Sequence, residues 1–412
     1  MYLCIDMKSF FASVECSLRG LNPMSTPLVV ADSSRGDGAI VLAITPYLKS
    51  LGVKNRCRLF EIDKNIKYIT ALPRMKYYIR YTTKIYEILA SFVAPEDIHV
   101  YSIDESFVHI APYLKYYHNS PQEMGIKLMN KINQELKIHS ACGAGTNMFL
   151  AKVALDIKAK HTQFGFYYFD EEKFINEMWN YKELTDIWQI GPGTKRRLSE
   201  LGMYTLKDIA LSDEKILSCS MGVIGRELYN RAWGRDDCTM NDIKDYTPLS
   251  TSINRTQIMF RDYTKKEAII PLLEMLFLVC LEMNKRNSDC LHISMFVGYS
   301  KEYNGASGKT ITLDYRSNSY FELSKIVKQV YCEIVYDLPI RSMGISAGSL
   351  SVIKNRQISL FNRDNIKDRV LLSAINEIHK KHGKNSLIPA LGLLEESTLI
   401  YRNKTIGGHN SE

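Results

Sequence analysis

The stretch that decides the fold opens the chain and reads Tyr2-Leu3-Cys4-Ile5-Asp6-Met7-Lys8-Ser9-Phe10-Phe11-Ala12-Ser13-Val14-Glu15. Its apolar first part predicts a β-strand that ends on Asp6, and its second part predicts a helix. Further along, a second strand-like run ends on two carboxylates and reads Ile98-His99-Val100-Tyr101-Ser102-Ile103-Asp104-Glu105. If the two strands pair, Asp6, Asp104 and Glu105 converge at one edge of a sheet.

Three carboxylates at one sheet edge need a compensating cation, because like charges held close together repel one another. Carboxylate oxygens are ligands that suit Mg²⁺ or Mn²⁺. Two such ions about 4 Å apart form the clamp that stabilises an in-line phosphoryl displacement. The alternative is that Asp104-Glu105 is a surface pair at the tip of a hairpin and that Asp6 is unrelated to it.

The composition is that of an ordinary globular protein, with 45% hydrophobic and 24% charged residues. A chain of 412 residues should hold several domains. Its net charge of +8 fits a polyanionic partner such as nucleic acid, and it fits a mildly basic cytosolic protein equally well. The nine cysteines are scattered and never form a Cys-x-x-Cys pair. We therefore expect a reducing cytoplasm, and neither a zinc site nor a disulfide framework.

We expect neither a signal peptide nor a membrane span. The N-terminal apolar run lacks a preceding basic region and is interrupted by Asp6. The longest apolar stretch covers residues 268–283 and contains Pro271, Glu274 and Glu282, so it predicts a buried helix.

The patterning divides the chain into segments with different element types. Residues 1–18 and 74–165 predict the order β-α-(insert)-α-β-β-α-β, in which residues 19–73 form a small inserted unit. Residues 166–236 predict an all-helical segment of short helices. Residues 237–248 are polar and predict a linker.

A second mixed domain is predicted over residues 249–352, with the order β-α-β-β-α-β of a split βαβ fold. Asn304-Gly305 lies between its two middle strands and supplies a turn residue with a positive φ. Residues 353–412 predict a polar tail with a helical segment near residues 369–382 and an irregular end. Together these segments predict an α+β multidomain protein.

A glycine-containing turn lies within the helical segment and reads Ile190-Gly191-Pro192-Gly193-Thr194-Lys195-Arg196-Arg197-Leu198. Such a turn between two helices exposes backbone N–H groups that can cradle a phosphate, as in a helix-hairpin-helix motif. The alternative is an ordinary interhelical turn with a basic flank.

Two groups of residues resemble a known family. Asp6-Met7-x-Ser9-Phe10-Phe11-Ala12-Ser13-Val14-Glu15 and Ser102-Ile103-Asp104-Glu105 resemble the palm signature of the Y-family translesion DNA polymerases, in particular the bacterial UmuC-like branch. The resemblance continues through Asn147-x-x-x-Ala151-Lys152-x-Ala154 and covers nearly the whole chain. It implies a catalytic palm (1–18 and 74–165), fingers (19–73), a helical thumb with the helix-hairpin-helix (166–236), and a DNA-gripping little finger (249–352).

The resemblance also implies roles for individual residues. Asp6 and Asp104 would bridge two Mg²⁺ ions, and Glu105 would hold the ion that activates the primer 3′-hydroxyl. The backbone carbonyl of Met7 would bind the ion on the nucleotide side. Contacts to DNA are implied at Gly191, Gly193, Lys195 and Arg255.

Two aromatic residues are candidates for contact with the sugar of the incoming nucleotide. Phe11 lies five residues after Asp6, and its ring would leave no room for a 2′-hydroxyl. The alternative for Phe11 is core packing, which is also what we expect for its neighbour Phe10.

Two lysines are candidates for contact with the triphosphate, namely Lys49 and Lys160. Lys49 takes the place of an arginine that the family commonly has in the fingers, and Tyr47 lies one position away from its usual place. The segment that carries Lys160 is one residue longer than a common form, which leaves Lys158 as an alternative. A lone lysine on a helix is more often simply solvated.

A short peptide in the predicted tail reads Gln357-Ile358-Ser359-Leu360-Phe361 and resembles the peptide with which bacterial polymerases dock on the sliding clamp. In such docking the Gln357 amide fixes one end, while Leu360 and Phe361 fill an apolar pocket. Short peptides also match by chance, so the alternative is a plain linker.

We therefore expect a template-directed, error-prone DNA polymerase of the SOS response that performs translesion synthesis without proofreading. Its expected partners are primer-template DNA, deoxynucleoside triphosphates and the sliding clamp, and we expect a monomer. One rival is a nucleotide cyclase with the same palm layout, against which the helix-hairpin-helix and the second mixed domain argue. The other is a non-catalytic DNA- and clamp-binding protein at stalled forks, against which the acid triad argues.

Overall fold

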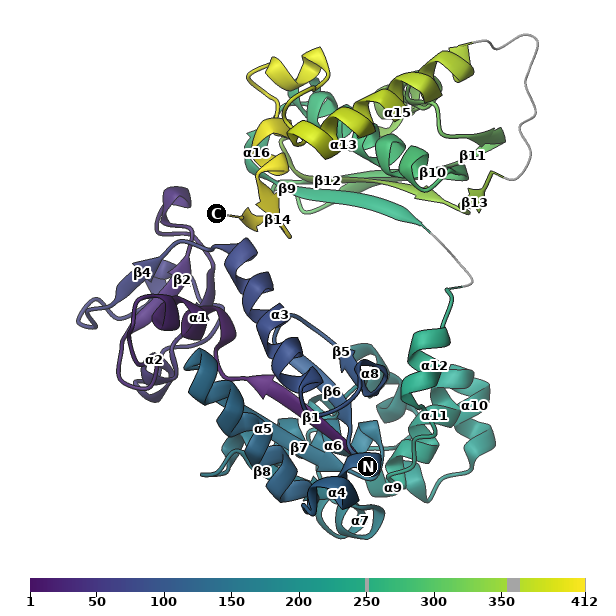
Figure 1. Ribbon diagram of the computed structural model, residues 1–412. Coiled ribbons are helices and arrows are strands. Elements are labelled where there is room, and N and C mark those ends of the chain that lie inside the picture. The colour runs from purple at the N-terminus through teal and green to yellow at the C-terminus, as the bar shows by residue number, and fades with distance from the viewer. Residues whose placement is uncertain (249–251, 354–363, 412) are drawn as a thin grey trace. The chain divides into compact units, whose positions relative to one another are not determined.

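The computed structural model describes residues 1–248, 252–353 and 364–411. The chain forms two compact units, shown as a ribbon in Figure 1. Unit 1 comprises Met1–Tyr246 together with His409–Glu412, and unit 2 comprises Thr247–Gly408. Among the helices of the described residues, none is long and apolar enough to cross a membrane.

The centre of unit 1 is a five-stranded sheet with the strand order β5-β6-β1-β7-β8. The first strand is central and pairs antiparallel with both β6 and β7, while β7 pairs parallel with β8. The predicted pairing is present in part: the strand expected over residues 98–105 ends at Val100, and β1 pairs instead with the next strand, which begins on Glu105. The strands are β1 (Tyr2–Met7), β5 (Ile98–Val100), β6 (Glu105–His109), β7 (Ser140–Gly145) and β8 (Phe166–Phe169).

Helices cover both faces of this sheet (Figure 1). Side chains of β1 alternate, so that Ile5 and Cys4 face opposite sides. On the side of Cys4, the short helix α6 (Met148–Val153) packs through Met148 and Ala151. The long helices α3 (Met75–Ala90) and α5 (Pro121–Leu136) contact each other, and α5 covers β7 and β8.

Two glycines of β7 allow α6 to lie directly against the sheet. A Cβ atom at Gly143 would meet the carbonyl oxygen of Ala151 at 2.1 Å, and one at Gly145 would meet the backbone nitrogen of Ala151 at 2.4 Å. Real Cβ atoms do not approach backbone atoms so closely, so any larger residue would push α6 away. The close approach brings Lys152, the next residue of α6, near the acid-bearing strands.

The inserted unit forms a small three-stranded sheet with its own core, in the strand order β3-β2-β4. It follows α1 and precedes α3, as the sequence predicts. The elements of this region are α1 (Phe10–Leu18), β2 (Leu28–Ala31), β3 (Val41–Ile44), α2 (Pro46–Ser50) and β4 (Ile69–Ala71). One further helix that the sequence pattern did not indicate, α4 (Ala111–Tyr117), follows β6.

The segment from residue 166 was expected to be all helical, and this expectation is wrong at its start. Residues Phe166–Phe169 form β8, because the run Phe-Tyr-Tyr-Phe suits a strand and pairs with β7. The first five of the following helices share one core with α6. The sixth lies in the predicted linker and packs Met240 with Cys4 and Phe107 of the central sheet. In chain order, the helices are α7 (Glu171–Met178), α8 (Pro192–Glu200), α9 (Leu206–Ala210), α10 (Glu214–Met221), α11 (Val223–Ala232) and α12 (Met240–Asp245).

Unit 2 contains a four-stranded sheet in the order β11-β10-β12-β9, with the predicted element order β-α-β-β-α-β. Asn304 has the expected positive φ, at 39°, in the turn between the middle strands. Pro271 lies inside the buried helix α13. The elements are β9 (Ile253–Tyr263), α13 (Lys265–Lys285), β10 (Ser288–Tyr299), β11 (Ala306–Ser317), α14 (Tyr320–Ile334) and β12 (Ile340–Gly348).

The C-terminal segment is not a tail without a core, which corrects the sequence expectation. Its helix α15 (Asp364–His382) buries Leu372 and Ile375 in the core of unit 2. The Asp368 carboxylate accepts hydrogen bonds from the Ser319 hydroxyl at 2.6 Å and from the Phe321 N–H at 3.2 Å. The remaining elements are β13 (Ser351–Val352), α16 (Leu399–Asn403), β14 (Thr405–Ile406) and β15 (His409–Asn410).

Candidate active site

The three predicted acid residues lie at one end of the central strands. Asp6 and Glu105 are direct cross-strand partners in the β1–β6 register. The Met7 N–H donates a hydrogen bond to the Asp104 carbonyl at 2.9 Å, which places Asp104 beside the end of β1. Before β6 the chain turns sharply, because the N–H groups of Tyr101 and Ser102 both donate to the Glu105 carbonyl. The turn lets consecutive residues 104 and 105 serve one site.

Glu105 is buried, with 7% of its surface exposed, and is held by two neighbours. The Lys152 ammonium lies 2.6 Å and 2.7 Å from its two carboxylate oxygens, and the Cys4 thiol donates to one of them at 2.9 Å. Burial alone would lower the pKa of Lys152, but Cys4, Glu105 and Asp156 outweigh it and raise that pKa. A buried charge pair of this kind is stable only because each member is fully engaged.

The carboxyl group of Asp6 has a raised pKa. Burial raises its pKa to about 6; the Lys160 ammonium acts against this shift, and the charges of Asp104 and Glu105 add to it. Lys160 lies 3.0 Å from the Asp6 carboxylate. The charge of Lys49 interacts with both groups. Partial burial lowers the pKa of Lys49, the charge of Asp6 acts against this shift, and the charge of Lys160 adds to it. The structure therefore brings both predicted triphosphate lysines near Asp6.

The segment after α6, which is one residue longer than a common form of the family, forms a π-helical turn over Ala154–Lys158. Such turns insert one residue into a helix and are frequent at functional sites. The turn separates the two candidate lysines: Lys160 reaches Asp6, while Lys158 pairs with Glu177 at 2.8 Å. Of the two alternatives that the sequence left open, only Lys160 lies at the acid triad.

The carboxylates suit a divalent cation by chemistry, although in the described residues no group of three His, Cys, Asp or Glu side chains is arranged to hold a metal ion. Burial is the main cause of the raised pKa of Asp6, and repulsion from Asp104 and Glu105 adds to it. A hard cation with oxygen ligands would relieve this repulsion. Asp6 and Asp104 are both partly exposed and fit this role, whereas Glu105 faces Lys152.

The two aromatic candidates have different surroundings. Phe10 is 3% exposed and belongs to the core, as the sequence argument for it suggested. Phe11 is partly exposed, and its ring stacks on that of Tyr78, with centroids 4.6 Å apart. Phe11 is therefore partly accessible, while one face of its ring packs on the buried ring of Tyr78.

The glycine-containing turn opens helix α8, with Gly191 at its N-cap and Gly193 in its first turn. Both are surrounded by open space, and Lys195 lies 3.4 Å from Glu183.

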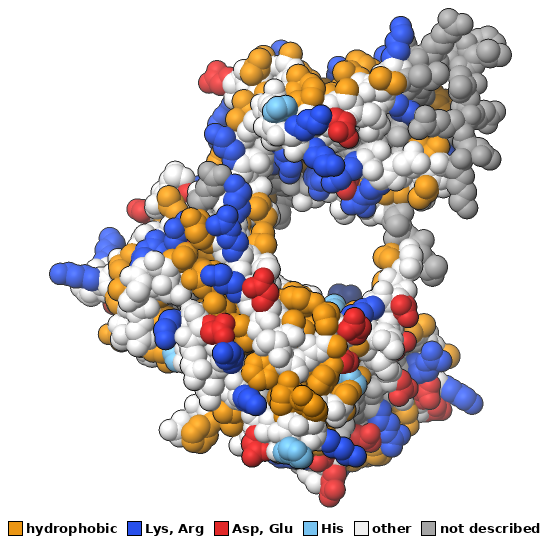
Figure 2. Space-filling model, in the orientation of Figure 1, with side chains coloured by type: hydrophobic (Ala, Val, Ile, Leu, Met, Phe, Trp, Pro, Cys, Tyr) orange, Lys and Arg blue, Asp and Glu red, His pale blue; other side chains and the backbone are white. Residues whose placement is uncertain are grey.

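In unit 2, Lys and Arg side chains gather on the surface that Figure 2 shows. Arg255 is exposed on β9, on the same strand face as Gln257, which contacts Thr398. Because side chains alternate along a strand, Arg255 lies on the other face of the sheet from the open one.

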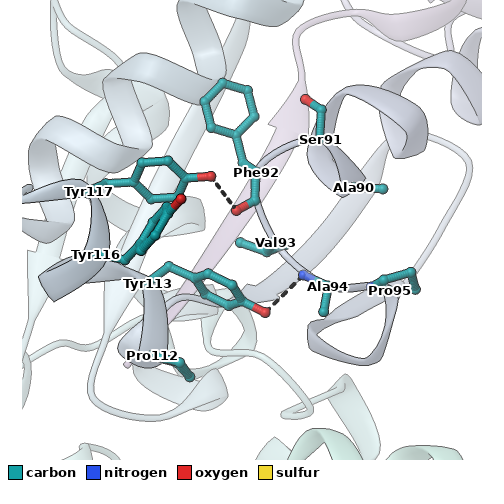
Figure 3. Close-up of a pocket in the computed structure, with 10 residues that line it drawn as sticks. All are labelled: Ala90, Ser91, Phe92, Val93, Ala94, Pro95, Pro112, Tyr113, Tyr116 and Tyr117. Carbon is teal, nitrogen blue, oxygen red and sulfur yellow. Dashed lines mark hydrogen bonds between the residues drawn. The ribbon is translucent and has the colours of Figure 1, made fainter.

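A hollow of about 490 Å³ lies elsewhere in unit 1. Figure 3 shows its aromatic lining, in which the Tyr117 hydroxyl donates to the Phe92 carbonyl and the Ala94 N–H donates to the Tyr113 hydroxyl. It lies beside the start of β5, at the opposite end of the β5–β6 pair from Asp104. Its lining contains no carboxylate, so it is separate from the acid triad.

The fold and the site define the class of protein. A sheet that carries strand-end carboxylates, with an inserted unit, a helical segment and a second mixed domain, is the arrangement of a Y-family DNA polymerase. A solved structure with this arrangement, the Y-family DNA polymerase chimera Dbh-Dpo4(243-245)-Dbh, matches with a TM-score of 0.63. The match covers 85% of this chain and 99% of the other at 21% identity, and at that identity it shows the fold.

The chain belongs to this family. The model of the impB/mucB/samB family matches residues 5–156, and that of the impB/mucB/samB family C-terminal domain matches residues 250–360. Among curated proteins, the putative UV-damage repair protein UvrX of Bacillus subtilis is 32% identical, with 99% of this chain and 97% of the relative covered. DNA polymerase IV 2 of the same organism is 28% identical over 98% of this chain and 97% of the relative.

These matches confirm the family, the fold class and the enzyme class predicted from the sequence, which is that of a DNA-directed DNA polymerase for translesion synthesis. The structure adds residues to which the sequence argument gave no role, chiefly Lys152, Asp156 and Tyr78. A signal for two of them was present in the sequence, because Lys152, Asp156 and Lys160 follow one another at four-residue intervals.

The clamp-like peptide stays a prediction. Gln357, Leu360 and Phe361 lie outside the described residues.

Proposed function

We propose that the chain extends a primer 3′ end with deoxynucleotides by two-metal phosphoryl transfer and copies past damaged bases in the bacterial SOS response. The observation that carries this proposal is the cross-strand pairing of Asp6 with Glu105 beside Asp104, with Lys160 on Asp6. The enzyme itself has little covalent chemistry to perform, so positioning and charge stabilisation carry the catalysis.

Asp6 and Asp104 would hold both Mg²⁺ ions, with the Met7 carbonyl on the nucleotide side and Glu105 on the primer side. Bound ions would neutralise the charge that develops on the phosphate oxygens. In this assignment Glu105 must exchange part of its contact with Lys152 for the ion. Mn²⁺ has the same ligand preferences and is expected to substitute.

The remaining residues of the proposal bind and orient. Lys49 and Lys160 would meet the triphosphate, and Phe11 would exclude a 2′-hydroxyl from the sugar site. Contacts to the DNA backbone would come from the turn that opens α8, through Gly191, Gly193 and Lys195. The peptide around Phe361 would dock on the sliding clamp, and the protein would act as a monomer in the cytoplasm.

Primer extension with Mg²⁺ tests the proposal, with Asp6→Ala and Asp104→Ala as the decisive variants. Each variant should abolish extension and leave binding to a labelled primer-template within about threefold, because a lost metal ligand removes transition-state stabilisation and not DNA contacts. Near-normal extension by either variant at saturating Mg²⁺ would remove the triad assignment. DNA binding without extension by the parent would favour the non-catalytic rival.

A further inference from the structure

A chain of alternating charges lies behind the acid triad. It runs from Glu105 through Lys152, Asp156 and Lys160 to Asp6. The Asp156 carboxylate lies 3.0 Å from the ammonium of Lys152 and 2.8 Å from that of Lys160. Because Asp6 and Glu105 are cross-strand partners, the chain closes into a ring.

Asp156 is the member of this ring that joins its two halves. Each lysine holds one acid of the triad on one side and Asp156 on the other. Without a shared carboxylate, the two ammonium groups held near one site would repel each other. The contact is partly shielded from solvent, since the Asp156 side chain is 27% exposed and that of Lys152 is 8% exposed.

The local backbone explains why Asp156 can reach both lysines. It lies at the centre of the π-helical turn Ala154–Lys158, four residues after Lys152 and four before Lys160. Lys158, which lies in the same turn, is directed to Glu177 instead. The π-helical turn therefore determines which lysine joins the ring: Lys160 does, and Lys158 does not.

We propose that Asp156 is a positioning residue, which holds Lys160 beside Asp6 for the incoming triphosphate and keeps Lys152 on Glu105. The inference rests on the proposed polymerase function. Asp156 touches neither the nucleotide nor the metal ions in this scheme. It acts by restraining two long side chains, which otherwise lose conformational freedom when a ligand binds.

The test compares Asp156→Asn, which keeps the shape and removes the charge, with the matched control Glu177→Gln, which removes the partner of Lys158. Single-nucleotide incorporation by the full chain should show a rise of about tenfold in KM for the deoxynucleotide with Asp156→Asn, equivalent to about 1.4 kcal/mol. The value of kcat should change by less than about threefold, because the restraint acts on binding. Glu177→Gln should match the parent, and Asp156→Glu, which keeps the charge, should recover most of the loss.

A double-mutant cycle separates positioning from a general structural effect. In the Lys160→Met background, Asp156→Asn should add nothing to KM, because the side chain that it positions is gone. An unchanged KM in the single variant, or fully additive effects in the double variant, would overturn the inference. Urea unfolding checks that each variant folds, and Asp156→Ser supplies a second neutral substitution.

Nucleotide binding without chemistry distinguishes failure of the inference from failure of the proposed function. Deoxynucleotide affinity is measured with a dideoxy-terminated primer-template and Ca²⁺ in place of Mg²⁺, for the parent and for Asp156→Asn. A parent that binds nucleotide but never extends a primer contradicts the polymerase proposal alone. A parent that extends primers and a variant that binds nucleotide equally well contradict the role of Asp156 alone.

Discussion

The ring of Phe11 stacks on the ring of Tyr78, with centroids 4.6 Å apart and planes 23° from parallel. Tyr78 is fully buried, and its hydroxyl donates a hydrogen bond of 2.9 Å to the buried carboxylate of Glu15. Arg74 and Arg19 bind the same carboxylate, and hydrogen bonds from these three side chains outweigh burial and lower the pKa of Glu15. Phe11 therefore rests on a support that is fixed by a complete hydrogen-bond network.

Replacing Phe11 by alanine should relax the choice of sugar. Because the proposed exclusion of a 2′-hydroxyl depends on ring volume, we expect the ratio of kcat/KM for ribonucleotide to that for deoxynucleotide to rise about 10- to 100-fold. Deoxynucleotide use should change much less. Single-nucleotide kinetics with both sugars measure the ratio, and Phe10→Leu, at the buried neighbour, is the control. An unchanged ratio with Phe11→Ala would place the exclusion of ribonucleotides elsewhere.

Removing the hydroxyl of Tyr78 should cost stability. In Tyr78→Phe the ring that supports Phe11 remains, but a buried hydrogen bond to a carboxylate is lost, so the free energy of unfolding should fall by about 1–2 kcal/mol. Urea denaturation measures this change. Tyr116→Phe is the matched control, since Tyr116 is 76% exposed and should change stability by less than about 0.5 kcal/mol. Equal losses in the two variants would contradict the importance of the network.

The two lysines of the π-helical segment should behave differently. Lys160→Met should raise KM for the deoxynucleotide about 10- to 100-fold, because a charged contact to the triphosphate is lost. Lys158→Met, which breaks the pair with Glu177, should leave KM within about twofold of the parent. Steady-state single-nucleotide incorporation decides between them, and the reverse ranking would assign the triphosphate contact to Lys158.

The clamp prediction is tested by replacing Gln357, Leu360 and Phe361 together with alanine. Distributive synthesis on a short primer should be unaffected, because these residues are outside the catalytic scheme. Stimulation by a bacterial sliding clamp should be lost, because tethering raises the effective concentration at the primer end. Primer extension with and without clamp on a long template measures both effects, and equal stimulation of the variant and the parent would return the segment to a linker.

The elements that sequence reasoning found are those with strong local signals. The run before Asp6, the helix α13 and the element order of unit 2 follow from apolar periodicity and turn residues, which depend only on neighbouring positions. Strand β8, which sequence reasoning missed, is short and gains its partner β7 only in the fold. The helix α15 was expected, but its packing on unit 2 through a few apolar positions such as Leu372 was not.

By itself, the sequence determined the strand that carries Asp6, the acid pair Asp104-Glu105 as its counterpart, and the family to which these motifs point. Only the tertiary structure decided that Lys152 binds Glu105 and that Lys160, not Lys158, reaches Asp6. The physical reason is that periodicity and acid motifs are local properties of the chain. A charge pair depends on how closely two distant segments pack, and here that packing is set by the two glycines of β7 against α6 and by the π-helical turn that follows.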